Sequence, residues 1–228
     1  IGEYNSGKST LLNAILGKYY ASTDFYEMTS WISRFIPSDI EYAIITYRDG
    51  KTEEINNSDF IINTEKRTVS MDVLKKIKRL DVGVKTQHKL IYIDCPGYGA
   101  SEDNETIMKE TITEADLALL CIDVTSIGGI KQASLIKELV DSHIPYLCVC
   151  TKIDRLDDDS QKEEISDFLS RQYGLSPEKI IFTSAKDGAS GMGVRELIQV
   201  IDRVVTNRML EIRVAAEKSF HVRFLRGL

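Results

Sequence analysis

The stretch that decides the fold is Gly2-Glu3-Tyr4-Asn5-Ser6-Gly7-Lys8-Ser9, and Thr10 follows it. This stretch matches the pattern G-x-x-x-x-G-K-[ST] of phosphate-binding loops. The glycines let the backbone turn its N–H groups toward an anion, and Lys8 adds a positive charge for the β- and γ-phosphates. The Ser9 hydroxyl is placed to ligate Mg²⁺. The loop therefore predicts a site for a nucleoside triphosphate with magnesium.

A helix is expected directly after the loop, from about Gly7 to Leu16. Its apolar residues recur at helical spacing: Leu11, Leu12, Ile15 and Leu16. The dipole of such a helix favours phosphate at its N-terminus. Only Ile1 precedes the loop, so we expect the strand that feeds the loop to be truncated before Ile1.

The composition is that of a globular protein, with 228 residues, 43% hydrophobic and 28% charged. The net charge of −6 gives no overall basic surface, so a nucleic acid partner is not expected. Apolar runs such as residues 115–124 contain Asp and are too short to span a bilayer. Cys148 and Cys150 lack the C-x-x-C spacing of a zinc site, and a reducing cytosol is the simplest setting for the thiols.

Most of the chain alternates apolar strands with amphipathic helices. Strands are expected at 89–94, 117–122, 145–150 and 180–182, and helices at 105–113, 131–142 and 160–173. This order predicts an α/β fold with a mostly parallel, doubly wound sheet covered on both faces. Ligands of such sheets bind at the carboxyl ends of the strands.

Two regions differ from this alternation. A β-hairpin is expected at 42–55 around the turn Asp49-Gly50, followed by a short helix within 59–79 that is best supported at 71–80. From Gly193 to Leu228 apolar residues keep helical spacing without a proline. We therefore expect a long C-terminal helix that leads toward a helical region, with two helices broken near Asn207 as the alternative.

One expected strand end carries Asp94-Cys95-Pro96-Gly97. Asp94 can hold Mg²⁺ through water, and the Gly97 N–H can contact the γ-phosphate, so this loop would respond to the state of the nucleotide.

Two further strand ends predict recognition of guanine. In Thr151-Lys152-Ile153-Asp154, the Asp154 carboxylate can accept hydrogen bonds from the N1–H and N2 amine of guanine, a donor pair that adenine lacks. The Lys152 stem can lie against the base. In Ser184-Ala185-Lys186, a small residue leaves a backbone N–H free for guanine O6.

With these loops in this order, the chain resembles the P-loop GTPases of the translation-factor-related class, and among them the bacterial dynamin-like proteins. The dynamin-like resemblance rests on the Gly-Glu-x-Asn opening, on Asn13-Ala14-Ile15-Leu16-Gly17, on the hairpin at 42–55 and on the long C-terminal helix. It covers about residues 1–207, which we assign as the GTPase domain. Residues 208–228 are assigned as the start of a helical stalk.

The resemblance implies roles for individual residues. A switch threonine would ligate Mg²⁺ and close over the γ-phosphate; Thr29 is our choice, with Thr23 and Ser30 as alternatives. The expected metal ligands are Ser9, Thr29 and Asp94, and the expected catalytic residues are Asn5, Lys8, Thr29 and Gly97. The expected contacts to GTP or GDP are Gly2, Tyr4, Asn5, Ser6, Gly7, Lys8, Ser9, Thr10, Gly97, Thr151, Lys152, Asp154, Ser184, Ala185 and Lys186.

One position differs from Ras-type switches, in which a glutamine orients the attacking water. Here the residue after Gly97 is Tyr98. Asn5 stands where potassium-dependent relatives carry a cation-ligating asparagine. The resemblance thus implies that Asn5 and switch-loop carbonyls hold K⁺ or Na⁺ beside the β–γ bridging oxygen, in place of an arginine finger.

Three functions follow from the resemblance. The first is a GTP-hydrolysing enzyme that self-associates, as a homodimer or a hetero-assembly through the GTPase face, and remodels a lipid membrane through regions outside this chain. Its location would be cytoplasmic, peripheral at the inner face of the membrane. The second is a cytosolic Era-like regulatory GTPase that acts on RNA or ribosomes. The third is a catalytically weak GTP-dependent binding module, because Tyr98 replaces the glutamine.

Overall fold

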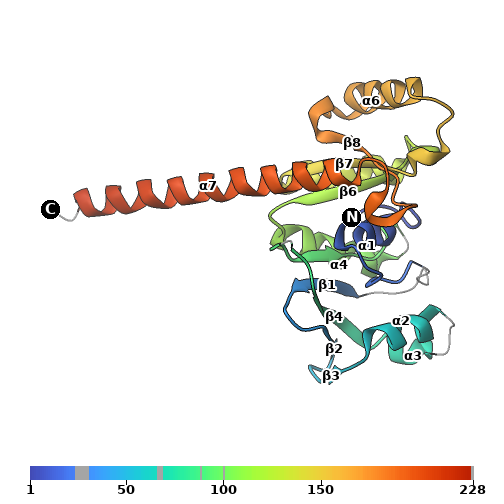
Figure 1. Ribbon diagram of the computed structural model, residues 1–228. Helices are drawn as coiled ribbons and strands as arrows, with labels where there is room; N and C mark the ends of the chain where they lie inside the picture. Colours follow the sequence, from blue (N-terminus) through green and yellow to red (C-terminus); the bar gives the residue numbers. More distant parts are fainter. Residues whose placement is uncertain (24–30, 66–68, 88, 100, 227–228) are drawn as a thin grey trace.

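The computed structural model describes residues 1–23, 31–65, 69–87, 89–99 and 101–226 (Figure 1). One sheet has five strands in the order β3 (Thr52–Glu54), β2 (Tyr42–Tyr47), β4 (Ile77–Val84), β1 (Ile32–Pro37) and β5 (Tyr92–Asp94). The other sheet has three parallel strands in the order β6 (Ala118–Asp123), β7 (Tyr146–Thr151) and β8 (Ile180–Phe182). The α/β fold expected from the sequence is confirmed.

Residues 1–3 pair with β6 on one side and with the loop after β5 on the other. The Ile1 carbonyl oxygen accepts a hydrogen bond from the Cys121 N–H at 2.8 Å, and Gly2 forms a parallel bridge with Cys121. On the other side, the Gly2 carbonyl oxygen accepts from the Tyr98 N–H at 3.0 Å. This short segment therefore occupies the place of a central strand, and the phosphate loop begins at its carboxyl end.

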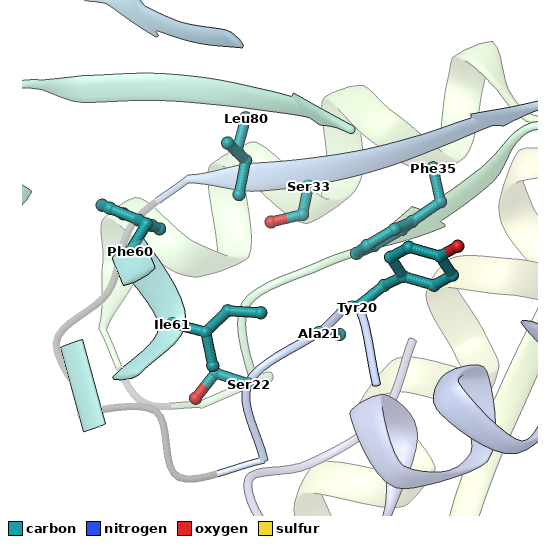
Figure 2. A pocket seen from close by; sticks show the side chains of 8 residues that line it. All are labelled: Tyr20, Ala21, Ser22, Ser33, Phe35, Phe60, Ile61 and Leu80. Carbon is teal, nitrogen blue, oxygen red and sulfur yellow. The ribbon is translucent and has the colours of Figure 1, made fainter. Parts of the chain in front are cut away.

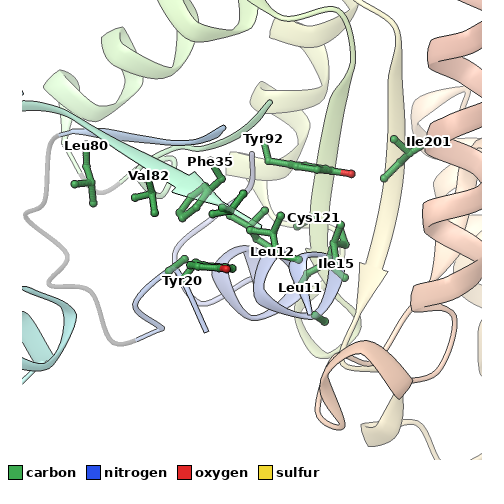
Figure 3. Packing of buried hydrophobic residues seen from close by; sticks show 14 of the residues in the cluster. Leu11, Leu12, Ile15, Tyr20, Phe35, Leu80, Val82, Tyr92, Cys121 and Ile201 are labelled. Atoms are coloured by element: carbon green, nitrogen blue, oxygen red, sulfur yellow. The ribbon is translucent and has the colours of Figure 1, made fainter. Parts of the chain in front are cut away.

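Helices cover both faces of the sheets. They are α1 (Lys8–Leu16), α2 (Asn57–Glu65), α3 (Met71–Leu74), α4 (Glu102–Glu114), α5 (Ile130–Ser142), α6 (Ser160–Tyr173) and α7 (Val194–Arg226). Single 3₁₀ turns are η1 (Val124–Ser126), η2 (Ile153–Arg155), η3 (Pro177–Lys179) and η4 (Gly188–Ser190). Buried side chains of α1 and α7 form one core with the inner face of the five-stranded sheet (Figure 3). Side chains of α4, α5 and α6 form the second core.

The hairpin expected at 42–55 is confirmed, with β2 and β3 antiparallel. The helix expected at 71–80 is wrong beyond Leu74, because β4 begins at Ile77. β4 pairs with β1 on one side and β2 on the other, and this two-sided pairing outweighs the local helical pattern. β1 was absent from the expectations, and α2 (Asn57–Glu65) begins the region 59–79 in which one short helix was expected nearer its end.

The C-terminal helix α7 is continuous for 33 residues, so the alternative of a break near Asn207 is wrong. Its first turns are anchored by Val194, Leu197 and Ile201, which are buried against the core. The helix then extends away from the body of the domain (Figure 1). Among the described residues, no helix combines the length and the apolar run needed to cross a membrane.

The four cysteines are buried with free thiols. Burial raises the pKa of the Cys95 and Cys121 thiols, so both stay protonated at neutral pH. Each thiol thus acts as a small apolar side chain of the core. Among the described residues, no group of three or more His, Cys, Asp and Glu side chains could hold a metal ion.

Candidate guanine nucleotide site

The phosphate loop turns tightly before α1. Gly7 precedes the helix in the left-handed region with φ of +82°, and Asn5 is also left-handed with φ of +60°. A Cβ on Gly2 would lie 2.5 Å from the Cys121 carbonyl oxygen, so only glycine fits between the loop and β6. The backbone N–H groups at the start of α1 are thereby gathered at the carboxyl edge of the sheet.

Two side chains of the first helical turn are fixed by bonds across the site. The Lys8 ammonium donates to the Glu3 carbonyl oxygen at 2.7 Å, within the loop. The Ser9 hydroxyl donates to Asp94 Oδ2, at the end of β5, at 2.7 Å. A hydroxyl and a carboxylate are the hard oxygen ligands that Mg²⁺ prefers, and phosphate and water supply its other ligands. The chemistry of Ser9 and Asp94 therefore fits this ion.

Of the three candidates for the switch residue, the structure describes Thr23 alone. Thr29 and Ser30 lie outside the described residues. Thr23 is exposed, and its hydroxyl lies 3.2 Å from that of Tyr19. The choice among the three hydroxyls stays a prediction.

The loop after β5 lies directly against the phosphate loop. A Cβ on Gly97 would be 3.0 Å from both the N and the Cα atoms of Tyr4, so a side chain there would push the two loops apart. Tyr98 is 7% exposed and belongs to the core formed with α4 and α5. Burial, together with the charges of Glu105 and Glu138, raises the pKa of its hydroxyl. Tyr98 is thus a core residue of the helical layer.

The loop after β7 is tied to the phosphate loop by two side chains. The Thr151 hydroxyl donates to the Ser6 carbonyl oxygen at 2.8 Å. The Lys152 ammonium donates to the Asn5 carbonyl oxygen at 2.6 Å and also forms an ion pair with Asp123 at 2.6 Å. These bonds hold the two loops in one arrangement.

The base-reading residues lie together at the ends of β7 and β8. The Ser184 hydroxyl donates to Asp154 Oδ1 at 2.5 Å, and the Lys186 N–H is 3.5 Å from that hydroxyl oxygen. The Asp154 carboxylate is exposed and stays available to a purine base. The structure thus gathers residues from loops more than a hundred positions apart at one edge, while their individual roles stay predictions.

Two polar residues of the site were missed in the sequence. Asp123 ends β6 and pairs with Lys152; its place at the carboxyl end of a buried strand was the available signal. Asn13 of α1 holds residues 19–23 (the strap), which lead toward the expected switch residues. Its Oδ1 accepts from the N–H groups of Tyr20 and Ala21 at 2.9 and 2.8 Å.

An apolar pocket lies beside this strap, between α2 and the sheet (Figure 2). Its walls are Tyr20, Ala21, Ser22, Ser33, Phe35, Phe60, Ile61 and Leu80. Its lining has no charged group to bind phosphate, so the pocket is separate from the nucleotide site.

Residues 1–207 match the family described as the elongation factor Tu GTP binding domain. The chain belongs to this family. It is therefore a P-loop GTPase domain that binds guanine nucleotide and hydrolyses GTP. The expected enzyme class is confirmed.

Curated relatives of three kinds match the chain. A dynamin-like protein 2 of Campylobacter jejuni is 26% identical over 75% of this chain, which spans 27% of that protein. A probable GTP-binding protein EngB of Acidobacterium capsulatum is 26% identical over 90% of this chain and 79% of its own length. The GTPase Era of Buchnera aphidicola is 27% identical over 59% of this chain and 45% of its own length.

Solved structures share the fold. A chain from an oligomerised bacterial dynamin pair, described as sensing and tethering membranes, has a TM-score of 0.65 at 18% identity and covers 88% of this chain and 36% of its own. Era in complex with MgGDPNP and a segment of 16S ribosomal RNA has a TM-score of 0.52 at 19% identity, over 88% of this chain and 53% of its own. The family is established, while the dynamin-like subgroup is not.

Proposed function

We propose that this domain hydrolyses GTP without a switch glutamine, and that the phosphate loop organises the reaction instead. The observation that carries the proposal is the place of Tyr98. It stands where Ras-type switches carry the glutamine, yet it is 7% exposed and lies near Glu105 and Glu138 of the helical layer. A side chain held there is unsuited to orient a water at the strand ends.

Residues of the phosphate loop and of the loop after β5 would supply the other roles in catalysis. Lys8 would supply a positive charge to the β- and γ-phosphates, and the Gly97 N–H would donate to the γ-phosphate. Ser9 and Asp94 would hold Mg²⁺, which neutralises charge that develops on the phosphate oxygens. Asn5 is the residue that would hold a monovalent cation, K⁺ or Na⁺, near the bridging oxygen.

Single-turnover and steady-state hydrolysis in different salts test this proposal. We expect turnover in potassium chloride to exceed turnover in choline chloride by at least about tenfold, the size of a small electrostatic contribution to a barrier. Asn5→Gly, which keeps the left-handed backbone at φ of +60° and removes the side-chain amide, should remove the difference between the two salts. Equal turnover in both salts would contradict the role of Asn5. Turnover no higher than background in every salt would favour the weak binding module.

For the whole protein we propose a dynamin-like role, in which GTP drives self-association and the regions outside this chain act on a membrane. Its support is the 33-residue helix α7 and the higher TM-score of the dynamin chain, 0.65 against 0.52 for Era. This role implies a cytoplasmic protein at the inner membrane face. With this role we also propose that the GTPase domain ends near residue 207 and that residues 208–228 begin a helical stalk.

A regulatory GTPase of the Era or EngB kind is the second candidate, because EngB matches over 79% of its own length. Two measurements separate the candidates. Light scattering with GDP and aluminium fluoride should show a dimer for the dynamin-like role, and co-sedimentation with liposomes should succeed for the longest available form of the protein. Co-sedimentation with ribosomes, with neither dimer nor liposome binding, would favour the second candidate.

A further inference from the structure

Asp123 ends β6 beside the nucleotide site, and both of its carboxylate oxygens have partners. Oδ1 accepts from the Thr125 N–H at 2.9 Å and from the Thr125 hydroxyl at 2.8 Å. Oδ2 accepts from the Lys152 ammonium at 2.6 Å. The side chain of Asp123 is 12% exposed and that of Lys152 is 25% exposed, so solvent screens this ion pair weakly.

Lys152 makes a second bond, to the Asn5 carbonyl oxygen at 2.6 Å. Asn5 and Lys152 have φ of +60° and +61°, a region that residues other than glycine rarely adopt. In the described part of the chain, three non-glycine residues have positive φ, and these two are joined by this bond. Strained backbone of this kind persists only where the surroundings hold it.

We propose that Asp123 is a positioning residue for nucleotide binding, which fixes the Lys152 ammonium so that the base-reading loop and the phosphate loop are held together. The carboxylate orients the ammonium toward the Asn5 carbonyl oxygen. Without the Asp123 carboxylate, the Asn5 carbonyl oxygen is the one acceptor left to the Lys152 ammonium. The bond that joins the left-handed residues Asn5 and Lys152 is then weaker. This inference rests on guanine nucleotide binding and is independent of the cation and membrane proposals.

The test compares four proteins by the dissociation rate of fluorescently labelled GDP: wild type, Asp123→Asn, Lys152→Gln and the double variant. Asparagine keeps the size of the side chain, but its amide cannot accept from both Thr125 and Lys152. Contacting residues couple by about 0.5–3 kcal/mol, so we expect Asp123→Asn to speed GDP release about tenfold. In the Lys152→Gln background the same change should alter the rate less than about twofold.

Asp167→Asn is the matched control. It breaks the ion pair of Asp167 with Arg171 at 2.9 Å, which is exposed on α6, and it should leave GDP release unchanged. A wild-type release rate for Asp123→Asn would overturn the proposal. An equal acceleration in the presence and absence of Lys152 would also overturn it.

A second variant and a second measurement cover the case in which Asp123→Asn does not fold. Thr125→Val removes one hydrogen bond to Oδ1 and leaves the carboxylate in place, so release should quicken about two- to threefold and only when Lys152 is present. The preference for guanine over xanthine nucleotides should stay at its wild-type value in both variants, because Asp154 is untouched. Loss of that preference would show a collapsed base pocket and overturn a positioning role.

Discussion

The Ser9 hydroxyl donates a hydrogen bond to Asp94 at 2.7 Å, which joins the first turn of α1 to the end of β5. The two side chains come from positions 85 residues apart. The hydrogen bond brings a hydroxyl oxygen and a carboxylate oxygen to one place, and the hydroxyl would exchange this bond for a bond to Mg²⁺ when the ion is present. This relationship is the basis of the first prediction.

Removal of either oxygen ligand should weaken the magnesium dependence of nucleotide binding. We expect Ser9→Ala or Asp94→Asn to lower GTP affinity about tenfold in excess magnesium, and to leave affinity in the presence of a chelator close to that of wild type. Titration calorimetry with and without magnesium measures both values. A variant that loses affinity equally in both conditions would indicate a structural role and not a metal ligand.

Asp154→Asn should change the preferred base from guanine toward xanthine, because a pair of acceptors becomes one acceptor and one donor. Hydrogen bonds to a charged group contribute about 1.5–3 kcal/mol, so GDP affinity should fall about 100-fold. Competition between guanosine and xanthosine diphosphates measures the change. Glu163→Gln, which alters an exposed carboxylate on α6, is the control and should keep the guanine preference.

Gly97→Ala should act on the triphosphate state more than on the diphosphate state. The added Cβ would lie 3.0 Å from the N and Cα atoms of Tyr4, so the loop after β5 must move away from the phosphate loop. We expect GTP affinity to fall about tenfold and GDP affinity to change less than about twofold, since the Gly97 N–H serves the γ-phosphate.

A glycine outside this contact provides the control. Gly129 has φ of −69°, and a Cβ there would be 3.6 Å from Glu3 Oε1, an ordinary contact distance. Gly129→Ala should therefore bind both nucleotides as the wild type does. Equal losses for GTP and GDP in Gly97→Ala would show that the contact with Tyr4 matters to the loop in every state.

The sequence predicted the place of the nucleotide loops at strand ends more accurately than it predicted the strands of the five-stranded sheet. Each nucleotide loop is a contiguous motif at a strand end, and strand ends of a doubly wound fold converge without any further information. The role of Asp123 was missed because its partner, Lys152, is 29 positions away and no local sequence pattern marks the pair. Long-range bonds between single residues are set by packing, which a motif does not encode.

The missed strand β1 and the misassigned β4 have a related cause. β1 turns Ser33 and Phe35 inward, so one of its two core positions is polar and its apolar alternation is weak. β4 contains buried Ile77 and Leu80 at a spacing that also suits a helix. Both strands are held by pairing on two sides, and they pair with each other in parallel from Ile32↔Arg79 to Pro37↔Val84.

Tyr20 anchors the strap toward the switch, and its ionisation should loosen the domain at high pH. Burial, followed by the hydrogen bond that its hydroxyl donates to Glu41 at 2.6 Å, raises the pKa of Tyr20 to about 12 from an ordinary value of 10.0. A raised pKa means that this contribution to stability is complete below pH 10, where the unfolded chain is also protonated. The contribution is lost as pH rises toward about 12.

Tyr20→Phe isolates this contribution, because it keeps the ring and removes the hydroxyl. The free energies of unfolding of wild type and variant, measured with urea, should differ by about 1.5–3 kcal/mol at pH 8, as expected for a hydrogen bond to a charged acceptor. The difference should shrink between about pH 10 and 12, because the hydroxyl of the unfolded chain ionises in this range while that of the folded chain stays protonated until about pH 12. Tyr47 shares a pKa raised to about 12 through Glu53, but it lies on β2 away from the strap. Tyr47→Phe should therefore give a similar pH profile of stability while leaving nucleotide exchange unchanged, whereas Tyr20→Phe should speed exchange. If both variants exchange nucleotide at the wild-type rate, the hydrogen bond of Tyr20 in the strap has no effect on the nucleotide site.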